Sequence, residues 1–384
     1  MREHSRPKVL IVGAFPPPGR KIFGGIITSC NALLESSFSE RFELILVDST
    51  QISNPPPRIA VRAYIAAKRL VTFIKKVVFL RPAVVLLFAS LGGSILEKGV
   101  MAWIARFAGV PVLFFARGAQ LIETAAGSRF HRAWILASLR GASHFLCQGP
   151  TWQRFATEVI GLPLSHAPIV PNWTATNRLL AIGEQRTARA PGHVTQMLFL
   201  GWMEKEKGIF ELLQACRELA VTHEFHLVIA GRGQAEKDAR VFIDHSNLAH
   251  RVRFAGWVHG EALERLMAES DVLVLPSWAE GLPNAMIEAM AAGLAVVVSA
   301  VGNVPDVVTN NVEALLVAPR QAEQLQQAIQ RLLDDRNMRQ QLACRGHAFV
   351  RQRYSVEPAI ERLSSVIEAA IAARTTLPSK VDEA

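Results

Sequence analysis

The sequence has few cysteines and no spacing typical of a metal site. Its 4 cysteines are Cys30, Cys147, Cys216 and Cys344, which lie far apart and form no redox or ligand motif. The 11 histidines include no HExxH motif and no cluster with cysteine. The sequence therefore predicts no bound metal and no cofactor. Scattered single cysteines also fit a reducing compartment.

Long hydrophobic runs are missing as well. No run of about 18 apolar residues indicates a membrane span. Met1–Lys8 is charged, and the apolar run Val9–Phe15 is too short to be the core of a secretory signal. We therefore expect a protein of the cytoplasm or of the inner face of a membrane.

Acidic residues are scarce in the first half of the chain. Residues 1–185 contain 21 lysine and arginine residues against 9 aspartate and glutamate residues, whereas the remainder contains 21 against 24. This excess predicts an anionic partner: a membrane surface, a phosphorylated acceptor or nucleic acid. Only 2 tyrosines are present and basic residues do not alternate with aromatic ones, so we predict no nucleic-acid partner.

The chain is long enough for two domains, and strand and helix patterns alternate in both halves. A length of 384 residues exceeds what one hydrophobic core usually supports. A polar stretch of mixed charge at residues 174–193 is expected to link the domains. We predict a first domain over residues 1–180, a second over residues 194–356 and a last helix over residues 358–373.

One stretch, Asp271–Ser299, carries the clearest functional signal. An apolar run at residues 272–276 is followed by a polar loop, a helix from Pro283 to Ala292 ended by Gly293, and a β-branched run. The pattern predicts a strand, a helix and a second parallel strand. The loop then lies at the carboxyl end of the first strand, where α/β sheets bind ligands.

Two carboxylates bracket this helix, Glu280 just before it and Glu288 inside it. The amides of Asn284, Ala285 and Met286 fall in its first turn, where N–H groups lack helical partners and favour an anion. A phosphate there, beside carboxylates that accept hydrogen bonds from hydroxyls, suits a nucleotide sugar. The alternative is that Glu280 is a surface residue and Glu288 merely complements the helix dipole.

The segment EGLPNAMIEAMAAG, residues 280–293, resembles the paired-glutamate motif of glycosyltransferase family 4. These enzymes have the GT-B fold, with two Rossmann-like domains whose parallel sheets face a central cleft. The resemblance implies that Glu288 binds the ribose hydroxyls, that Glu280 lies near the transferred sugar, and that transfer is retaining without a metal. It also implies that the first domain binds the acceptor, that the second binds the nucleotide sugar, and that the last helix packs back on the first domain.

The first loop of the second domain fits the resemblance with one departure. Lys207, before a glycine, resembles the family's phosphate-binding lysine. Family members commonly have arginine where this chain has Trp202. A second cation would then have to come from Arg232 or Lys205, and lysine and arginine are not interchangeable on a diphosphate.

Later loops of the second domain also match. Trp257 and Val258 stand where the family places the nucleotide base, although a structural tryptophan explains the pattern equally well. Asn303 stands where a second glycine is usual. The residues assigned to donor binding are Glu288, Gly24, Gly25, Gly231, Arg232, Trp257, Val258, Gly281, Leu282, Asn284, Ala285 and Met286. Glu280, Lys207 and Arg117 are assigned to catalysis.

In the first half, Gly24 and Gly25 open a predicted helix over residues 26–35. They resemble the glycine pair that faces the diphosphate and acceptor in GT-B transferases, although a plain turn explains them too. Arg117 follows a predicted strand at residues 112–115. It resembles a family histidine or arginine that contacts phosphate, and a surface arginine is the alternative.

Residues 59–80 predict a helix with a basic stripe. Arg62, Arg69 and Lys76 recur at seven-residue spacing, with Lys68 and Lys75 beside them, and apolar residues lie elsewhere around the helix. A basic amphipathic helix binds anionic membrane surfaces. The alternative is a solvated face on an ordinary packing helix.

The sequence thus predicts a GT-B glycosyltransferase that moves a sugar from a UDP- or GDP-sugar to a glycan or lipid-linked acceptor. Cell-surface polysaccharide biosynthesis is the expected pathway. One alternative is a sugar-nucleotide-binding or scaffolding protein that has lost transfer activity, which Trp202 and Asn303 motivate. A nicotinamide-dependent enzyme is disfavoured because no Gly-x-Gly-x-x-Gly follows the first strand.

Overall fold

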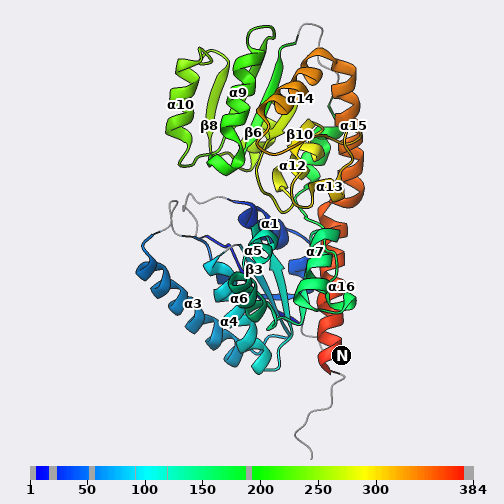
Figure 1. The fold of residues 1–384 in the computed structure, drawn as a ribbon. Coiled ribbons are helices and arrows are strands. Elements are labelled where there is room, and N and C mark those ends of the chain that lie inside the picture. Colours follow the sequence, from blue (N-terminus) through cyan, green and yellow to red (C-terminus); the bar gives the residue numbers. More distant parts are fainter. Residues whose placement is uncertain are drawn as a thin grey trace, which may run out of the picture. The chain divides into compact units, whose positions relative to one another are not determined.

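The computed structural model of the chain describes residues 6–16, 24–51, 57–90, 92–118, 120–186 and 193–375, which form two compact units. Of these residues, those up to 171 and those from 357 onward make the first unit, and residues 172–356 make the second. Each unit is a parallel sheet with helices on both faces (Figure 1). This confirms the predicted α/β class with two Rossmann-like domains.

In the first unit the described strands form one parallel sheet in the order β2-β1-β3-β4-β5. The strands are β1 (Lys8–Gly13), β2 (Glu43–Asp48), β3 (Val84–Ala89), β4 (Val112–Ala116) and β5 (His144–Phe145). Every residue of β3 and β4 is buried, because helices cover both faces of a parallel sheet. Residues 168–170 make only an isolated bridge, from Ile169 to Cys147. Pro168 and Pro171 flank it and lack the N–H groups that a ladder needs.

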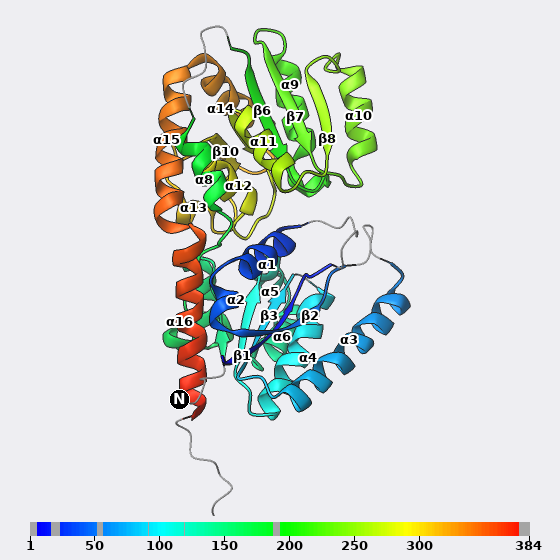
Figure 2. The same cartoon turned by 180° about the vertical axis from the view of Figure 1, so that it is seen from behind.

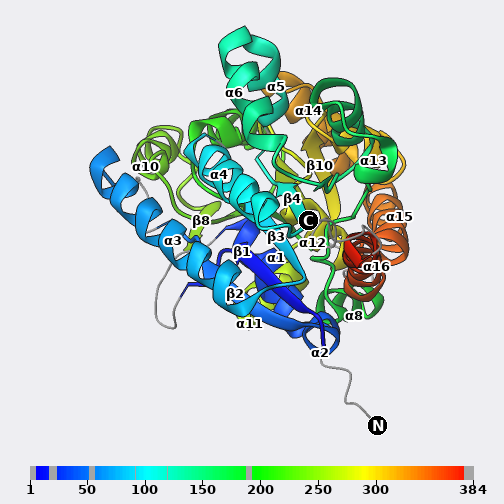
Figure 3. The same cartoon turned by 90° about the horizontal axis from the view of Figure 1, so that it is seen from below.

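Three helices cover one face of this sheet: α3 (Ile59–Leu80), α4 (Gly93–Phe107) and α6 (Arg129–Leu139). They lie in a row (Figure 3). The other helical segments of the unit are α1 (Gly25–Glu35), α2 (Phe38–Arg41), α5 (Gln120–Gly127), α7 (Pro150–Arg154), a π-helix at Phe155–Ile160, a 3-10 turn at Leu164–His166, and α16 (Val356–Thr375). No helix in the described ranges is both long and apolar enough to cross a membrane.

Helix α16 is tied to the first unit although the chain reaches it only after the second unit (Figure 2). Arg41 forms ion pairs with Glu361 at 2.6 Å and with Glu368 at 2.7 Å. Near the other end of the helix, Arg374 donates to the Pro82 carbonyl at 3.2 Å. Side chains at both ends of α16 therefore bind this unit.

The basic stripe predicted on α3 is not one exposed face. The Arg69 guanidinium contacts the Glu97 carboxylate at 2.6 Å and a carbonyl at the end of β2. Lys76 donates to the Leu46 carbonyl at 2.7 Å. Arg62, in contrast, is exposed. The spacing does mark one face of the helix, but it is largely the face packed against α4 and β2, since long cationic side chains can reach carbonyls at a sheet edge.

In the second unit the described strands form one parallel sheet in the order β11-β10-β9-β6-β7-β8. The strands are β6 (Thr195–Leu200), β7 (Phe225–Ala230), β8 (Val252–Gly256), β9 (Val272–Leu275), β10 (Ala295–Ser299) and β11 (Leu315–Val317). Alternate residues of β9 enter different cores, with Val272 and Val274 on one side and Leu273 and Leu275 on the other. The sheet is therefore buried on both faces.

Helices α9 (Ile209–Leu219), α10 (Glu236–His245) and α14 (Ala322–Asp334) share the first of these cores. Helices α8 (Asn177–Glu184), α11 (Glu261–Glu269) and α12 (Asn284–Ala291) share the second. The remaining helical segments are a 3-10 turn at Lys205–Lys207, α13 (Val304–Val307) and α15 (Arg336–Arg353).

The stretch predicted as an interdomain linker is largely part of the second unit. Leu179 and Leu180 of α8 are buried in its core. Arg186 donates to the carbonyls of Met267, Ser270 and Ala292 at 2.7 to 3.0 Å. The division between units consequently falls at residue 171, before the predicted boundary at 180. Residues 187–192 of the predicted linker lie outside the described residues.

Candidate functional site

The candidate site of the second unit is built from loops at the carboxyl ends of its strands. Backbone bonds tie the loops after β6, β7 and β8 side by side. The Gly201 amide donates to the Ala230 carbonyl at 3.0 Å, and the Gly231 amide donates to the Gly256 carbonyl at 2.7 Å. Because the strands are parallel, all these loops leave the same edge of the sheet. Residues assigned from separate parts of the sequence are therefore neighbours here.

Two glycines allow the loop after β9 to lie close to its neighbours. Gly208 has φ +72, and a Cβ there would lie 2.0 Å from the Pro276 carbonyl oxygen. Gly302 has φ +58, and a Cβ there would lie 1.8 Å from the Glu280 carbonyl oxygen. Only glycine satisfies both the left-handed backbone and the contact. These two contacts fix the loop after β9 between the loops after β6 and β10.

The predicted residues Lys207 and Glu280 meet at this point. The Lys207 Nζ lies 2.5 Å from Glu280 Oε1, and Ser277 Oγ donates to the same oxygen at 2.8 Å. Both charged side chains are mostly buried, at 30% and 15% exposure. The pair therefore holds the Lys207 ammonium at the strand edge, where the Glu280 carboxylate balances its charge. An arriving anion would compete with Glu280 for the lysine.

Helix α12 begins beside this pair at Pro283, with no side-chain cap. Asn172 fixes its start by donating to the Leu282 carbonyl at 3.1 Å and to the Asn284 side chain at 2.8 Å. The Met286 amide donates to the Pro283 carbonyl at 3.1 Å. Contrary to the prediction, this amide is therefore not available to an anion. The side chains of Leu282 and Met286 are buried in the core. Any contact from these two residues would have to use their backbone.

Glu288 is the buried carboxyl of α12. Its side chain is enclosed, with the residue 6% exposed, and no residue in the described ranges donates a hydrogen bond to its carboxylate. Burial raises the pKa of Glu288 from 4.5 to about 7. A carboxyl without a partner in an apolar helix is costly to bury, and hydroxyl donors from a ligand would relieve that cost.

Two tryptophans meet at the loops after β6 and β8. The rings of Trp202 and Trp257 lie edge to face, with centroids 4.6 Å apart at 80°. Both are partly exposed. A Cβ on Gly256 would lie 3.6 Å from the guanidinium of Arg232, so this exposed cation is close to the same loop. The departure at Trp202 thus replaces a cation by an aromatic contact to the predicted base loop. Val258, also assigned to the base, packs partly buried against the adjacent core.

A second aromatic cluster was missed from the sequence. The Trp278 ring lies under the Arg320 guanidinium at 4.4 Å, with Lys205 at 5.8 Å. Its Nε1 donates to Glu211 at 2.9 Å and its amide donates to the Glu206 carbonyl at 2.8 Å. Lys205, considered as a substitute cation, therefore lies beside an aromatic ring. The contact of Trp278 with Glu211 joins residues 67 positions apart, so no local pattern in the sequence indicates it.

The first unit has a separate polar site at its own strand edge. Arg117 follows β4, and its Nη2 donates to Ser29 Oγ at 3.1 Å. Ser29 lies on α1 and donates to the Gly25 carbonyl at 3.0 Å. Burial lowers the pKa of Arg117 to about 10, which leaves it charged at neutral pH. Arg117 is thereby connected to the helix that Gly24 and Gly25 open, while residues 17–23 of that loop lie outside the described residues.

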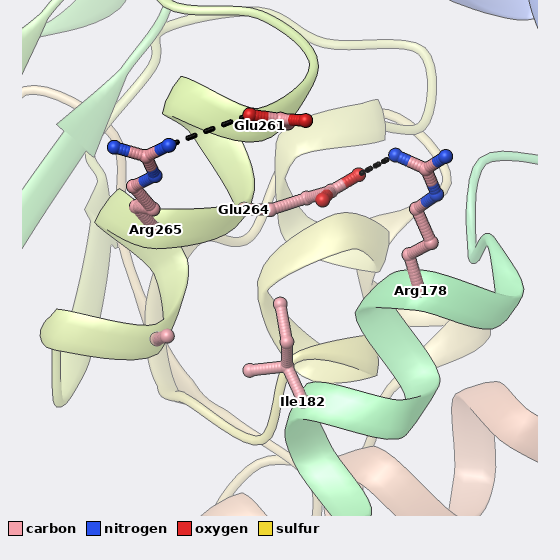
Figure 4. A pocket seen from close by; sticks show the side chains of 6 residues that line it. Arg178, Ile182, Glu261, Glu264 and Arg265 are labelled. Atoms are coloured by element: carbon pink, nitrogen blue, oxygen red, sulfur yellow. Dashed lines mark hydrogen bonds and ion pairs between the residues drawn. The ribbon is translucent and has the colours of Figure 1, made fainter.

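The described residues also include a surface recess apart from the site residues above. No group of three histidine, cysteine, aspartate or glutamate residues in these ranges could hold a metal ion. A recess of about 380 Å³ lies between α8 and α11 (Figure 4). Two ion pairs line it, Arg178 with Glu264 at 3.6 Å and Arg265 with Glu261 at 3.4 Å. None of the predicted site residues lines this recess.

The second half of the chain is similar to known glycosyltransferase sequences. Residues 184–348 match the family described as Glycosyl transferases group 1. An uncharacterized glycosyltransferase of Methanocaldococcus jannaschii is 32% identical over 41% of each chain. The 2-deoxystreptamine glucosyltransferase of Streptomyces kanamyceticus is 33% identical over 36% of each chain. The lipopolysaccharide core biosynthesis glycosyltransferase LpsE of Rhizobium meliloti is 26% identical over 49% of this chain and 54% of its own length. The chain thus matches only about half or less of these relatives.

Solved structures resemble nearly the whole chain. Sucrose-phosphate synthase from Thermosynechococcus elongatus has a TM-score of 0.77 at 19% identity and covers 96% of this chain and 100% of its own. HepE of Anabaena, in complex with UDP-glucose, has a TM-score of 0.69 at 17% identity and covers 94% and 99%. The predicted GT-B fold class is confirmed. At these identities the likeness concerns the fold alone.

Proposed function

We propose, from the premise that residues 184–348 are a Glycosyl transferases group 1 domain, that this chain is a retaining glycosyltransferase of the family 4 type. It transfers a sugar from a UDP- or GDP-sugar to a glycan or lipid-linked acceptor in cell-surface polysaccharide biosynthesis. The cluster of Lys207, Glu280 and Ser277 beside the start of α12 carries the proposal. The name of the Rhizobium relative and the UDP-glucose held by HepE support the pathway and the donor class.

The donor's diphosphate occupies the strand edge next to Lys207. During transfer, the bond from the anomeric carbon to the phosphate oxygen breaks, and the acceptor oxygen bonds to the same carbon on the same face. The acceptor proton passes to an oxygen of the leaving diphosphate. Lys207 and the start of α12 stabilise the charge that develops on that group, as a divalent cation would elsewhere. The scheme therefore needs no metal.

The two glutamates have different roles in this proposal. Glu280 is ion-paired and mostly buried, so it holds Lys207 in place and orients the sugar. Glu288 has no partner in the described structure, and the ribose hydroxyls supply one by donating to its carboxylate. The Trp202–Trp257 pair and Arg232 border the nucleobase.

A second candidate is a sugar-nucleotide-binding protein of the same fold with impaired transfer. The observation that favours it is Trp202, because its ring contacts Trp257 and leaves one cation fewer for the diphosphate. The two candidates differ in turnover and agree in nucleotide binding. Transfer by the purified protein would exclude the second.

Calorimetric titration with UDP and with GDP in EDTA tests the proposal. We expect one of the two nucleotides to bind. Replacing Lys207 by methionine should lower the affinity for that nucleotide by about 10- to 100-fold, since a hydrogen bond to a charged group contributes about 1.5–3 kcal/mol. Lys205→Met, two residues away, is the matched control and should change affinity about twofold or less.

Incubation with radiolabelled UDP- and GDP-sugars in EDTA then separates the candidates. Release of nucleotide, or transfer to an extracted glycan, supports the transferase. Binding without turnover supports the impaired protein. Strict dependence on a divalent metal would contradict the proposed role of Lys207.

A further inference from the structure

We propose that the first unit docks on an anionic lipid bilayer through the outer surface of α3 and α4. The proposal goes beyond transfer chemistry and stands or falls independently of it. The docking surface consists of one stripe on each helix. The α3 stripe is Val61, Tyr64, Lys68, Val71, Lys75 and Val78, and the α4 stripe is Leu96, Val100 and Phe107.

The α3 stripe is a regular apolar and basic face. Its residues follow one another at three- and four-residue spacing, so they lie along one side of the helix. All are exposed, and Val71 and Val78 are 52% and 56% exposed. The ammonium of Lys68 lies 4.7 Å from the Tyr64 ring. Large apolar residues at this density are usually buried when no partner is required.

The opposite side of α3 fixes which face is turned outward. Only Phe73 and Val77 of its 22 residues are buried. Arg69 and Lys76 anchor the same side by bonds to Glu97 and to carbonyls of β2. Rotation of the helix to hide the α3 stripe would break these contacts. The exposed face is therefore a stable feature of the fold.

Helix α4 extends the apolar surface. It packs beside α3 in the same helical layer (Figure 3). Leu96, Val100 and Phe107 recur at four- and seven-residue spacing, and Phe107 is 83% exposed. The last turn of α3 carries a further exposed aromatic residue, Phe79, at 78% exposure. An amphipathic surface of this kind inserts its apolar groups at the boundary between headgroups and acyl chains.

Charge identifies the occupant as anionic. No aspartate or glutamate occurs between Asp48 and Glu97, whereas this span contains seven lysine and arginine residues. Glu97 is itself neutralised by Arg69 at 2.6 Å and Lys98 at 2.8 Å. A second copy of the surface would bring like charges together at Lys68 and Lys75, which disfavours self-association. Lysines among valines suit a bilayer, since their stems stay with the apolar layer while the ammonium groups reach the headgroups.

Sedimentation with vesicles tests the proposal, using the full chain without donor or acceptor. We expect binding to phosphatidylcholine vesicles that contain 30% phosphatidylglycerol, and much weaker binding to phosphatidylcholine alone. Lys68→Gln with Lys75→Gln should reduce partition about 30-fold at low ionic strength, because each cation near an anionic surface contributes about 1 kcal/mol. Val71→Ser with Val78→Ser should also reduce partition, because less apolar surface then enters the bilayer.

The matched control removes two exposed cations from the second unit, by Lys237→Gln with Arg253→Gln. It should bind as the wild type does. An equal loss in this control, or failure of the wild type to sediment with the anionic vesicles, would overturn the proposal. So would a dimer in analytical ultracentrifugation that Val71→Ser with Val78→Ser dissociates, since the surface would then bind a second copy.

Discussion

Helices α12 and α3 use their residues in opposite ways. Six of the eight residues of α12 are buried, whereas only two of the 22 residues of α3 are. The core surrounds α12, so the identity of nearly every side chain is dictated by packing, and Glu288 is the polar exception. Packing constrains little of α3, so the regular apolar and basic pattern on its outer side has no explanation within the fold. The residue types that packing does not explain are the ones on which the two proposals rest: a buried acid in α12 and exposed valines in α3.

The largest expected effect comes from disturbing the loop that precedes α12. Gly302→Ala places a methyl group against the Glu280 carbonyl, so the Lys207–Glu280 pair must shift. We expect turnover to fall by about 100-fold, since displacements near 1 Å can cost that much. Gly260→Ala is the control, because Gly260 also has a positive φ of +54 but no atom within 4 Å. Equal activity in the two variants would show that the contact at Gly302 does not set the geometry of the pair.

The inward anchoring of α3 provides the next test. Arg69→Met leaves a mostly buried carboxylate with one cation fewer and should lower the free energy of unfolding by about 3 kcal/mol. Arg62→Met, on the same helix but exposed, should change it by less than about 0.5 kcal/mol. Urea unfolding measures both. If the two variants lost the same stability, α3 would not be fixed as described.

Glu288 gives a pH-dependent contrast with exposed acids. Its pKa is higher in the folded protein than in the unfolded chain, so it stabilises the fold below pH 4.5, and this stability is lost as the pH rises through about 7. Glu288→Gln should therefore gain stability relative to wild type by about 2–3 kcal/mol between pH 5 and pH 8. Glu261→Gln, an exposed acid, should show no such gain. Urea unfolding at pH 5 and pH 8 measures this gain. If the stability difference between Glu288→Gln and wild type were the same at both pH values, Glu288 would be ionised throughout this range.

The smallest effect is expected for the outer side of α3. Lys68→Gln with Lys75→Gln should leave the free energy of unfolding within about 0.5 kcal/mol of wild type, because neither side chain packs against the unit. Thermal unfolding would show this as nearly unchanged melting. A large loss would mean that these lysines support the fold, and the vesicle result would then lose its meaning.

Much of the fold was predictable from local patterns. Buried parallel strands read as short apolar runs, as β3 and β4 do, and α3 was predicted with the bounds that the structure shows. The polar stretch at α8 was misread because only Leu179 and Leu180 reveal its buried side. The periodicity on α3 indicated one face of the helix, but not whether that face is exposed or packed against the sheet. Arginine and lysine side chains can either point to water or reach backbone carbonyls.

The candidate site was predicted residue by residue, but not as a set of contacts. Lys207 and Glu280 were assigned from two separate loops, and the structure brings them to 2.5 Å. The bond from Asn172 to Asn284 joins positions 112 residues apart, and the contact of Trp202 with Trp257 spans two strands. Such pairings depend on the order of the strands in the sheet, and this order cannot be derived from the spacing of residues along the sequence. The roles assigned to these residues stay predictions until nucleotide binding is measured.

The position of α16 has a consequence for biosynthesis of the protein. The first unit is assembled from two segments, and its last helix is synthesised only after residue 356, when the whole second unit has already been made. Until then Arg41 lacks the carboxylates of Glu361 and Glu368. The unit that begins first on the ribosome is thus completed last. A fragment meant to fold as the first unit alone would need residues 357–375 joined to residue 171.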